Sequence, residues 1–213
     1  MIYSLDIETA PYRAEEYTDK KVYNAPANWK DQDKIAAKVA EMRAADIKKA
    51  ALHWWTGRVV CISVTDVISG KPQSFFEPEE KNLLRDFATY MSGKSSSNFA
   101  WHIIGKNVLD FDLPFLRGRM MYHDLGLPAW LRPNHSIEDI DHIFGRSRAS
   151  GQHGKLSDYA FGLDIKGKLD DISGEEVPQM YIDGHIERIV EYCEQDTQIV
   201  AEIYRRFERE FVA

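Results

Sequence analysis

The sequence predicts a single α/β domain over residues 1–213, built on a mixed sheet of roughly five strands flanked by helices. Short runs of strand-forming residues alternate along the chain with longer segments of helical periodicity. No linker, change of composition or internal repeat divides it. Apolar residues make up 44% of the chain, which is enough to form a hydrophobic core.

The first elements are a strand and a long helix separated by polar chain. Residues 2–8 alternate apolar and polar side chains, and Pro11 is expected to end the strand. Residues 12–33 are polar and predict a long excursion before the next element. Residues 33–52 have the period of a helix, which we interpret as an ordinary packed surface helix. Its apolar face is formed by Ile35, Val39, Met42 and Ile47.

The remaining elements follow from the same periodicities. The apolar run 58–66 and the segment 73–76 predict a hairpin, because glycine and proline lie between them. Residues 92–98 are rich in serine and predict a flexible loop. We expect a buried strand at 99–104, a short segment at 137–140, and helices at 79–91, 113–123, 156–161, 175–181 and 186–211.

The charge of the chain limits its partners. Thirty-four acidic residues against 27 basic ones give a formal charge of −7, so strong non-specific binding to nucleic acid or anionic membranes is disfavoured. No apolar run reaches the roughly 20 residues of a membrane span, and no signal peptide is visible. Cys61 and Cys193 fit buried, reduced thiols better than a disulfide. We therefore expect a cytoplasmic protein that does not enter a membrane.

Three acidic motifs could carry chemistry. Asp6 and Glu8 are two residues apart on a strand, so their carboxylates leave the same face, roughly 6 to 7 Å apart. Two carboxylates so placed repel each other, and a hard cation such as Mg²⁺ would neutralise them. Such a pair also arises by chance at the exposed end of a strand, and the triplet alone favours that interpretation.

The second motif lies where a buried strand gives way to a helix. Asp112 is at the predicted helix start, with Pro114 in the first turn. The alternative to a catalytic role is an ordinary N-cap, which aspartate favours. Asp110 competes for the same position.

The third motif lies in the last helix. Tyr192 and Asp196 are four residues apart and share one helix face, at the edge of an apolar stripe. For this pair alone, a tyrosine–aspartate hydrogen bond or a solvated acid is about as good an interpretation as a metal site.

Together the motifs Asp-x-Glu at 6–8, Asn-x-x-x-Phe-Asp at 107–112 and Tyr-x-x-x-Asp at 192–196 resemble the DEDD superfamily of 3′–5′ exonucleases. The third motif looks like that of the tyrosine branch. Residues 107–116 are similar to the second exonuclease motif of family B DNA polymerases, and the chain as a whole is most similar to the stand-alone predicted exonucleases related to their proofreading domain. Lys106 departs from the pattern, where an aromatic residue or a histidine is more usual.

This resemblance implies a ribonuclease H-like fold and metal-dependent release of nucleoside 5′-monophosphates from the 3′ end of single-stranded DNA. It implies two Mg²⁺ or Mn²⁺ ions, which would bring the formal charge from −7 to about −3. The implied ligands are Asp6, Glu8, Asp112 and Asp196, with Tyr192 orienting the attacking water, and the implied substrate contacts are Ile7, Thr9, Asn107 and Phe111. Replication or repair proteins would be further partners.

Two other functions stay open. Ribonuclease D-like proteins share the tyrosine form of the third motif, so trimming of RNA 3′ ends is one alternative. A catalytically silent module that binds nucleic-acid ends is the other. Trp54 and Trp55 are candidates for contact with substrate or a partner, because exposed aromatic rings can stack on unpaired bases. Basic residues that could contact phosphates, although such residues are more often simply solvated, are Lys106, Arg117, Arg119 and the cluster Arg146, Arg148, His153 and Lys155.

Overall fold

The computed structural model of the protein describes residues 1–94, 102–131, 136–145, 154–166 and 172–211. Its centre is a five-stranded sheet of order β3-β2-β1-β4-β5. The strands are β1 (Ile2–Pro11), β2 (Gly57–Asp66), β3 (Pro72–Phe75), β4 (His102–Gly105) and β5 (Ser136–Asp139). β1, β2 and β3 pair antiparallel, whereas β4 and β5 run parallel to β1. The predicted mixed sheet is confirmed.

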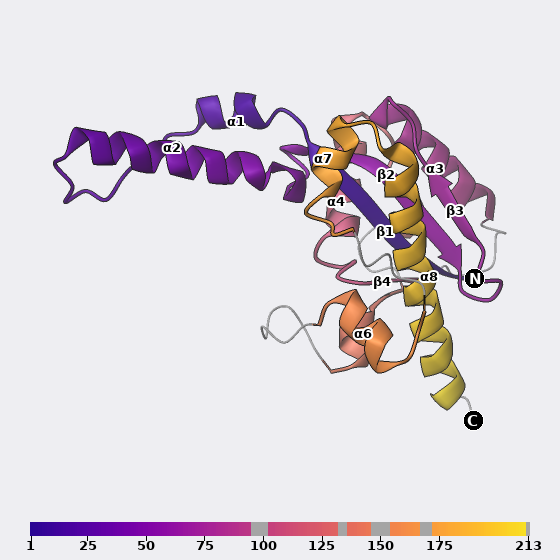
Figure 1. The fold of residues 1–213 in the computed structure, drawn as a ribbon. Helices are drawn as coiled ribbons and strands as arrows, with labels where there is room; N and C mark the ends of the chain where they lie inside the picture. The colour runs from indigo at the N-terminus through magenta and orange to yellow at the C-terminus, as the bar shows by residue number, and fades with distance from the viewer. Residues whose placement is uncertain (95–101, 132–135, 146–153, 167–171, 212–213) are drawn as a thin grey trace.

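Helices cover both faces of this sheet (Figure 1). The helices are α1 (Ala14–Lys20), α2 (Gln32–Lys48), α3 (Glu80–Lys94), α4 (Asp112–Tyr122), α5 (Ile140–Ile143), α6 (Leu156–Gly162), α7 (Val177–Ile182) and α8 (Ile186–Phe211), with 3-10 turns η1 (Ala50–Leu52) and η2 (Ala129–Leu131). α3 and α4 form the main hydrophobic core with one face of β1 and β2. α8 covers the other face, where α7 joins it.

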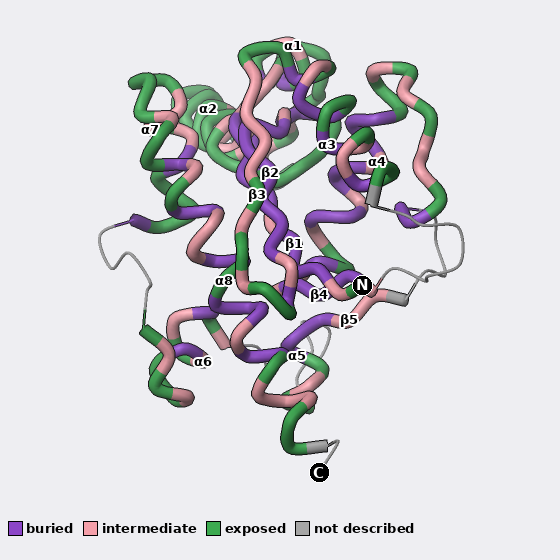
Figure 2. Tube along the Cα trace, turned by 90° about the vertical axis from the view of Figure 1, so that its right-hand side faces the viewer, coloured by how far each residue is buried: buried purple, intermediate pink, exposed green. Residues whose placement is uncertain are grey.

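The two faces of β1 differ in chemistry because successive side chains point to opposite sides. Tyr3, Leu5 and Ile7 are buried in the core with α3 and α4. The alternate residues Ser4, Asp6 and Glu8 face α8. Figure 2 shows β1 as a largely buried strand at the centre of the molecule. One strand therefore supplies both the core and a line of polar groups beneath α8.

The strand β1 ends at Pro11, as predicted, and so extends past the alternating residues 2–8. Ala10 and Pro11 still pair with Arg58 and Gly57, because a proline is tolerated at the end of a ladder where no further N–H is required. The register shifts between Glu8 and Thr9, which marks a β-bulge. The bulge lies directly after the acidic pair of the strand.

Most other predicted elements are confirmed with shifted ends. The hairpin is β2 and β3, and the segment 137–140 overlaps the edge strand β5. The predicted loop 92–98 is wrong at residues 92–94, where α3 continues for a further turn. The rest of that loop and residues 99–101 lie outside the described part of the chain, as does most of the basic cluster around Gly151.

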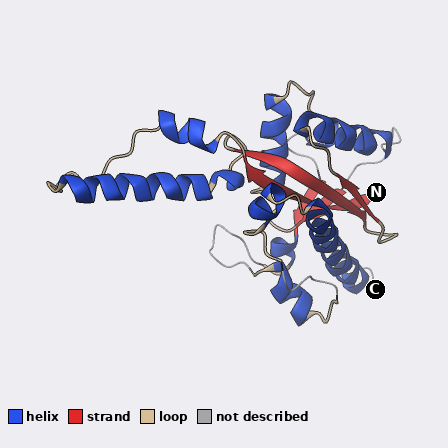
Figure 3. Cartoon of the chain, turned by 45° about the horizontal axis from the view of Figure 1, so that its top comes forward, coloured by secondary structure: helices blue, strands red, loops and turns tan. Residues whose placement is uncertain are grey.

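The segment between β1 and β2 forms a helical arm, defined here as residues 12–56. Figures 1 and 3 show α1 and α2 projecting together away from the sheet. The predicted surface helix is confirmed as α2, although it ends at Lys48 instead of residue 52. Its apolar residues Ile35, Val39, Met42 and Ile47 are half-buried, and no residue of α2 is fully buried. α1 was not predicted, since its seven residues are too few to show an apolar period. Ion pairs of Lys21 with Asp46 and of Arg43 with Asp19 join the two segments.

Candidate active site

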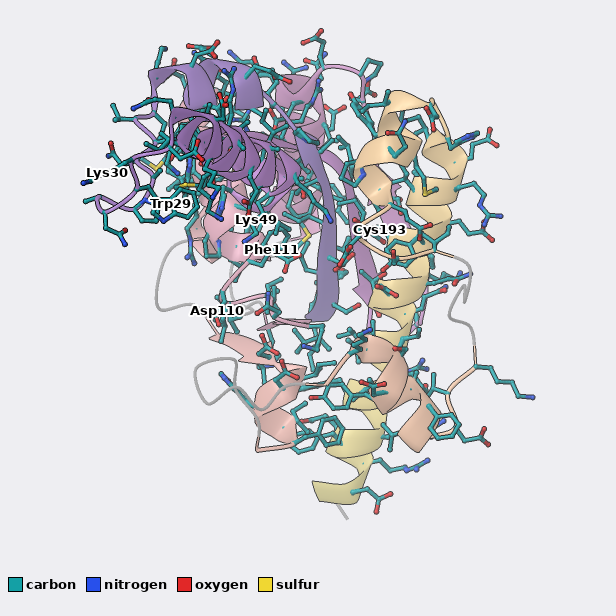
Figure 4. All side chains as sticks on the ribbon, turned by 60° about the vertical axis from the view of Figure 1, so that its left-hand side comes forward. Trp29, Lys30, Lys49, Asp110, Phe111 and Cys193 are labelled. Atoms are coloured by element: carbon teal, nitrogen blue, oxygen red, sulfur yellow. The ribbon has the colours of Figure 1, made fainter. Side chains whose placement is uncertain are left out.

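Asp6 and Glu8 extend from β1 toward α8. The thiol of Cys193 on α8 donates to Oδ2 of Asp6 at 3.4 Å. One ligand atom each from Asp6, Glu8 and Cys193 lies within 4.8 Å of the others. Asp6 is partly exposed and Glu8 is 8% exposed, so the pair is not the solvated strand end considered above. Figure 4 shows Cys193 on one side of β1, with Asp110 and Phe111 on the other.

Asp112 reaches the same strand from α4. Its Oδ1 accepts the backbone N–H of Ile7 at 3.0 Å. β4 pairs with β1 only as far as Ser4, so this N–H has no partner in the sheet and the carboxylate satisfies it. The N-cap position belongs to Phe111, and Asp112 is the first residue of the helix. Asp110 is exposed, so the geometry selects Asp112 between the two acids.

The turn before α4 places Asp112. Gly105 is required at the end of β4, because an added Cβ would lie 2.5 Å from Cβ of Val108 and 3.0 Å from the carbonyl oxygen of Leu5. Asn107 has a φ of 60°, in the left-handed region that asparagine tolerates well. Its carbonyl accepts the N–H groups of Asp110 and Phe111. Asn107 therefore shapes the turn, and this explains why an asparagine stands at this position of the second motif.

α8 contributes Tyr192 and Asp196. The Tyr192 hydroxyl hydrogen-bonds the carboxylate of Asp196, so the tyrosine–aspartate bond foreseen as an alternative is present. Both side chains are largely buried, and Asp196 lies within electrostatic reach of Asp6 and Glu8. The hydrogen bond and the acidic cluster are thus parts of one arrangement.

Buried hydroxyls hold α8 against the sheet directly below this cluster. Ser4 donates to the carbonyl oxygen of Thr197 at 2.7 Å. The hydroxyl of Thr197 lies 3.1 Å from that of Ser63 and 2.9 Å from that of Thr65. Thr197 follows Asp196, so the network sets the height and rotation of the helix at the site. Sequence reasoning missed these residues, although small polar residues within apolar strands are a signal for buried partners.

Burial and neighbouring charges raise the pKa values of three of these carboxylates, Asp6, Glu8 and Asp112. Burial raises the pKa of Asp6 well above its usual range, and the charges of Asp112 and Asp196 add to this. Glu8 is shifted in the same direction by burial and then by Asp6 and Asp196. Burial raises the pKa of Asp112 to about 7, although the hydrogen bond from Ile7 opposes the shift. The cluster therefore resists ionisation without a neutralising charge.

This donor set fits a hard divalent cation. The atoms available are mainly carboxylate oxygens, which Mg²⁺ and Mn²⁺ prefer. The neighbouring Cys193 is a poor ligand for such ions because burial and the adjacent Cys61 raise the pKa of its thiol, which stays protonated. Both cysteines are free and buried, as predicted, and they lie beside each other in one apolar cluster.

The structure corrects three candidate phosphate contacts. Arg119 is 1% exposed and forms a buried ion pair with Glu80, whose Oε1 accepts its Nε at 2.9 Å. Lys106 is paired with Asp141 at 2.7 Å. Arg117 donates to the carbonyl oxygen of Leu131. Long-range partners of this kind have no signature in the local sequence.

The candidate substrate contacts differ in how much surface they offer. Ile7 is buried in the core and its N–H donates to Asp112, so Ile7 positions the Asp112 carboxylate. Thr9 is 7% exposed, and its hydroxyl donates to the carbonyl oxygen of Ala51 at 2.7 Å. Phe111 is half-buried and its ring centroid lies 5.6 Å from that of Phe115.

The two tryptophans at the base of the arm keep exposed ring surface. Trp54 packs over Gly118 of α4, where a Cβ would lie 2.3 Å from its ring. Trp55 stacks on His53 with centroids 4.7 Å apart. Both remain partly exposed, so a contact with substrate or a partner stays a prediction for this pair.

A family model described as "Predicted 3'-5' exonuclease related to the exonuclease domain of PolB" matches residues 55–209. The chain belongs to this family. The part that matches the exonuclease model contains Asp112, Tyr192 and Asp196, whereas Asp6 and Glu8 precede it.

Two individual proteins resemble this member of the exonuclease family. The uncharacterized protein MJ0365 of Methanocaldococcus jannaschii is 27% identical over 168 residues, 75% of this chain and 91% of that protein. The family B DNA polymerase of the hyperthermophilic archaeon Pyrobaculum calidifontis matches with a TM-score of 0.61 and 13% identity, over 97% of this chain. The chain spans 24% of that polymerase. The likeness shows the fold, which is ribonuclease H-like.

Proposed function

We propose that the protein is a metal-dependent 3′–5′ exonuclease that releases nucleoside 5′-monophosphates from single-stranded DNA, with residues 1–213 acting as one domain. The observation that carries the proposal is the convergence of Asp6, Glu8, Asp112 and Asp196 from three separate elements on one partly buried site. Self-repelling carboxylates are costly there unless cations neutralise them. Membership of the exonuclease family supports the same conclusion.

The four carboxylates are proposed to hold two Mg²⁺ or Mn²⁺ ions. When bound, such ions lower the pKa of water and neutralise charge on a phosphodiester under attack. The chain's own contribution is to fix the ligands. The N–H of Ile7 holds Asp112, and the thiol of Cys193 holds Asp6. Asp196 is positioned by the hydrogen bond from Ser4 to the carbonyl oxygen of Thr197, the next residue of α8.

Tyr192 is proposed to orient the attacking water rather than to remove its proton. Burial, and then the charges of Asp196 and Glu8, raise the pKa of the phenol far above its ordinary value. The hydroxyl is therefore protonated at neutral pH and is a poor base. It can donate to Asp196 while its oxygen accepts from a water, which fixes the water's position.

DNA is the proposed substrate because the family is described by its relation to the exonuclease domain of a DNA polymerase. The Phe111-Asp112 motif, which begins α4, supports the same choice. Replication or repair proteins are proposed as partners on this ground. RNA trimming and silent end-binding remain alternatives that the same experiment separates.

The test uses 5′-labelled DNA and RNA oligonucleotides of identical sequence with Mg²⁺ or Mn²⁺. We expect a ladder of shortened DNA products with wild type and none with Asp6→Ala or Asp6→Asn. Asp110→Asn is the matched control, because Asp110 is an exposed acid two residues from Asp112. It should retain the wild-type ladder.

Each outcome selects one function. A ladder on DNA that the Asp6 variants lose supports the proposal. A ladder on RNA alone would replace it with RNA trimming. Binding of 3′ ends without cleavage under any metal condition would leave a silent end-binding module.

A further inference from the structure

A groove lies where the helical arm joins the sheet. Its volume is about 590 Å³, and its walls come from the end of β1, the base of the arm and α7. The residues that matter for its chemistry are Thr9, Lys48, Lys49, Leu52, Glu175 and Ile182. None of them belongs to the acidic cluster.

The groove begins beside the acidic cluster. Thr9, in its wall, directly follows Glu8 at the β-bulge. The hydroxyl of Thr9 holds the carbonyl oxygen of Ala51, and the N–H of Tyr12 donates to the carbonyl oxygen of Thr56 at 2.7 Å. These bonds anchor both ends of the arm at the end of the strand that carries Asp6 and Glu8. A strand leaving the site along the arm would therefore enter the groove.

The charges of the arm are divided between paired and unpaired cations. Arg13, Lys20, Lys21, Lys34, Lys38 and Arg43 each form an ion pair within the arm. Lys30, Lys48 and Lys49 have no acidic partner among the described residues. Figure 4 shows Lys30 beside Trp29 at the tip of the arm and Lys49 at its base. Two of the three unpaired cations thus line the groove.

The apolar wall of the groove is unusually exposed. Leu52 on the arm is 57% exposed and Ile182 on α7 is 71% exposed. Glu175 is the one acid among the groove-lining residues, against two lysines. Cations beside exposed aliphatic side chains suit a ligand that alternates negative charge with flat apolar surface. A single nucleic-acid strand has this character, whereas a duplex hides the faces of its bases in the stack.

We propose that this groove binds the single-stranded DNA next to the nucleotide being removed, with Lys48 and Lys49 contacting its phosphates. This inference rests on the proposed function, because it assigns the path of that function's substrate. Lys48 and Lys49 neutralise phosphates, and Leu52 and Ile182 contact bases or sugars. The groove compensates locally for the formal charge of −7.

The test measures how binding depends on salt. Each phosphate contact on a single strand contributes about 0.7 to the slope of log Kd against log salt concentration. A 5′-fluorescein dodecathymidylate with phosphorothioate linkages at its 3′ end, which slow hydrolysis, is titrated with full-length protein in Mg²⁺. We expect the slope of Lys48→Gln/Lys49→Gln to be smaller than that of wild type by about 1.4. Between 50 and 200 mM salt, wild type would lose roughly sevenfold more affinity than the variant.

The matched control is Lys20→Gln/Lys34→Gln. It removes the same charge from the same arm, but both lysines are paired with acids and 73% exposed at their side chains. Its slope should equal that of wild type. An equal loss of slope in both double variants would show a general charge effect and overturn the proposal.

Two further results separate this proposal from others. If wild type cleaves DNA but Lys48→Gln/Lys49→Gln has the same salt-dependence slope as wild type, the groove does not bind the strand and the proposed function still holds. If the three proteins have the predicted slopes but wild type cleaves no oligonucleotide, the groove binds single-stranded DNA and the proposed exonuclease function is refuted. Light scattering gives one more test. A wild-type protein that is dimeric while Lys48→Gln/Lys49→Gln is monomeric would overturn the proposal, because a second copy of the chain would then occupy the groove.

Discussion

The backbone N–H of Ile7 donates to Oδ1 of Asp112 at 3.0 Å, across 105 positions of the sequence. This bond joins the strand that carries Asp6 and Glu8 to the helix that carries Asp112. It forms where β4 stops pairing with β1, so the carboxylate replaces a missing ladder partner. One oxygen of Asp112 thus takes part in the fold itself.

Asp112→Asn should separate this role in the fold from the proposed role as a metal ligand. The amide oxygen of asparagine can still accept the N–H of Ile7, so the metal-free variant should unfold at a urea concentration equal to or above that of wild type. Hydrolysis should fall by roughly 100-fold or more, because a ligand charge is lost. A variant with normal turnover would exclude Asp112 from the proposed site, and Asp110→Asn serves as the matched control.

The metal-free protein should lose stability as pH rises. The folded-state pKa of Asp112, about 7, lies above its usual value of 3.8. The contribution of Asp112 to the free energy of unfolding is therefore fully present below about pH 3.8 and is lost as the pH rises through 7. The loss is roughly 4 kcal/mol at most. The shifts of Asp6 and Glu8 have the same sign.

Urea midpoints between pH 5 and pH 8, with chelator and with Mg²⁺, measure this effect. We expect the midpoint to fall with pH in chelator and to recover with Mg²⁺, because a bound cation favours the ionised carboxylates. Asp112→Asn should flatten the dependence in chelator. A midpoint that rises with pH over this interval would contradict the shifts.

Tyr192→Phe should lower kcat by about 10-fold or more while leaving the KM for a DNA 3′ end within about twofold. The hydroxyl is lost, but the ring still fills its place beside Asp196. Because the raised pKa keeps the phenol protonated, the pH–rate profile of wild type should show no ionisation of Tyr192 near neutrality. Tyr204→Phe, on the same helix and next to His102, is the control and should match wild type. Unchanged turnover in Tyr192→Phe would remove Tyr192 from the mechanism.

Glu80→Gln should destabilise the protein by about 3 to 5 kcal/mol, because it leaves Arg119 buried without its counter-charge. Glu80 also accepts the N–H of Val59 at 2.7 Å and contacts His123 at 2.8 Å, so it joins α3 to β2 and α4. Equilibrium unfolding in urea measures the loss. Glu79→Gln changes an exposed neighbour and should cost less than about 0.5 kcal/mol. Equal stability of the two variants would show that the buried pair contributes nothing.

Local spacing made much of the site predictable. The two-residue period of β1 placed Asp6 and Glu8 on one face, and the helical period of α8 placed Tyr192 beside Asp196. Both relations depend only on positions a few residues apart, where backbone geometry dictates which side chains share a face. The predicted ligands do converge in the fold, while their catalytic role and the single-domain organisation remain predictions.

Other features depended on contacts between distant segments. Arg119 and Lys106 have the same local character as solvated basic residues, and only their pairing with Glu80 and Asp141 removes them from the list of phosphate contacts. The apolar residues of α2 predicted a packed surface helix, and only the fold shows that this helix lies in a projecting arm. A hydrophobic period shows that a helix has an apolar face but does not name the surface that covers it.

The sequence by itself determined the mixed sheet, the positions of the longer helices and the three acidic motifs, because these follow from short-range periodicity and residue type. No helix among the described residues is both long and apolar enough to cross a membrane, in agreement with the hydropathy of the chain. Only the tertiary structure showed that Asp112 is buried while Asp110 is exposed, brought Cys61 beside Cys193, and placed Lys48 and Lys49 in a groove next to the acidic cluster. Burial and charge pairing are properties of three-dimensional proximity, and sequence spacing does not encode that proximity for residues a hundred positions apart.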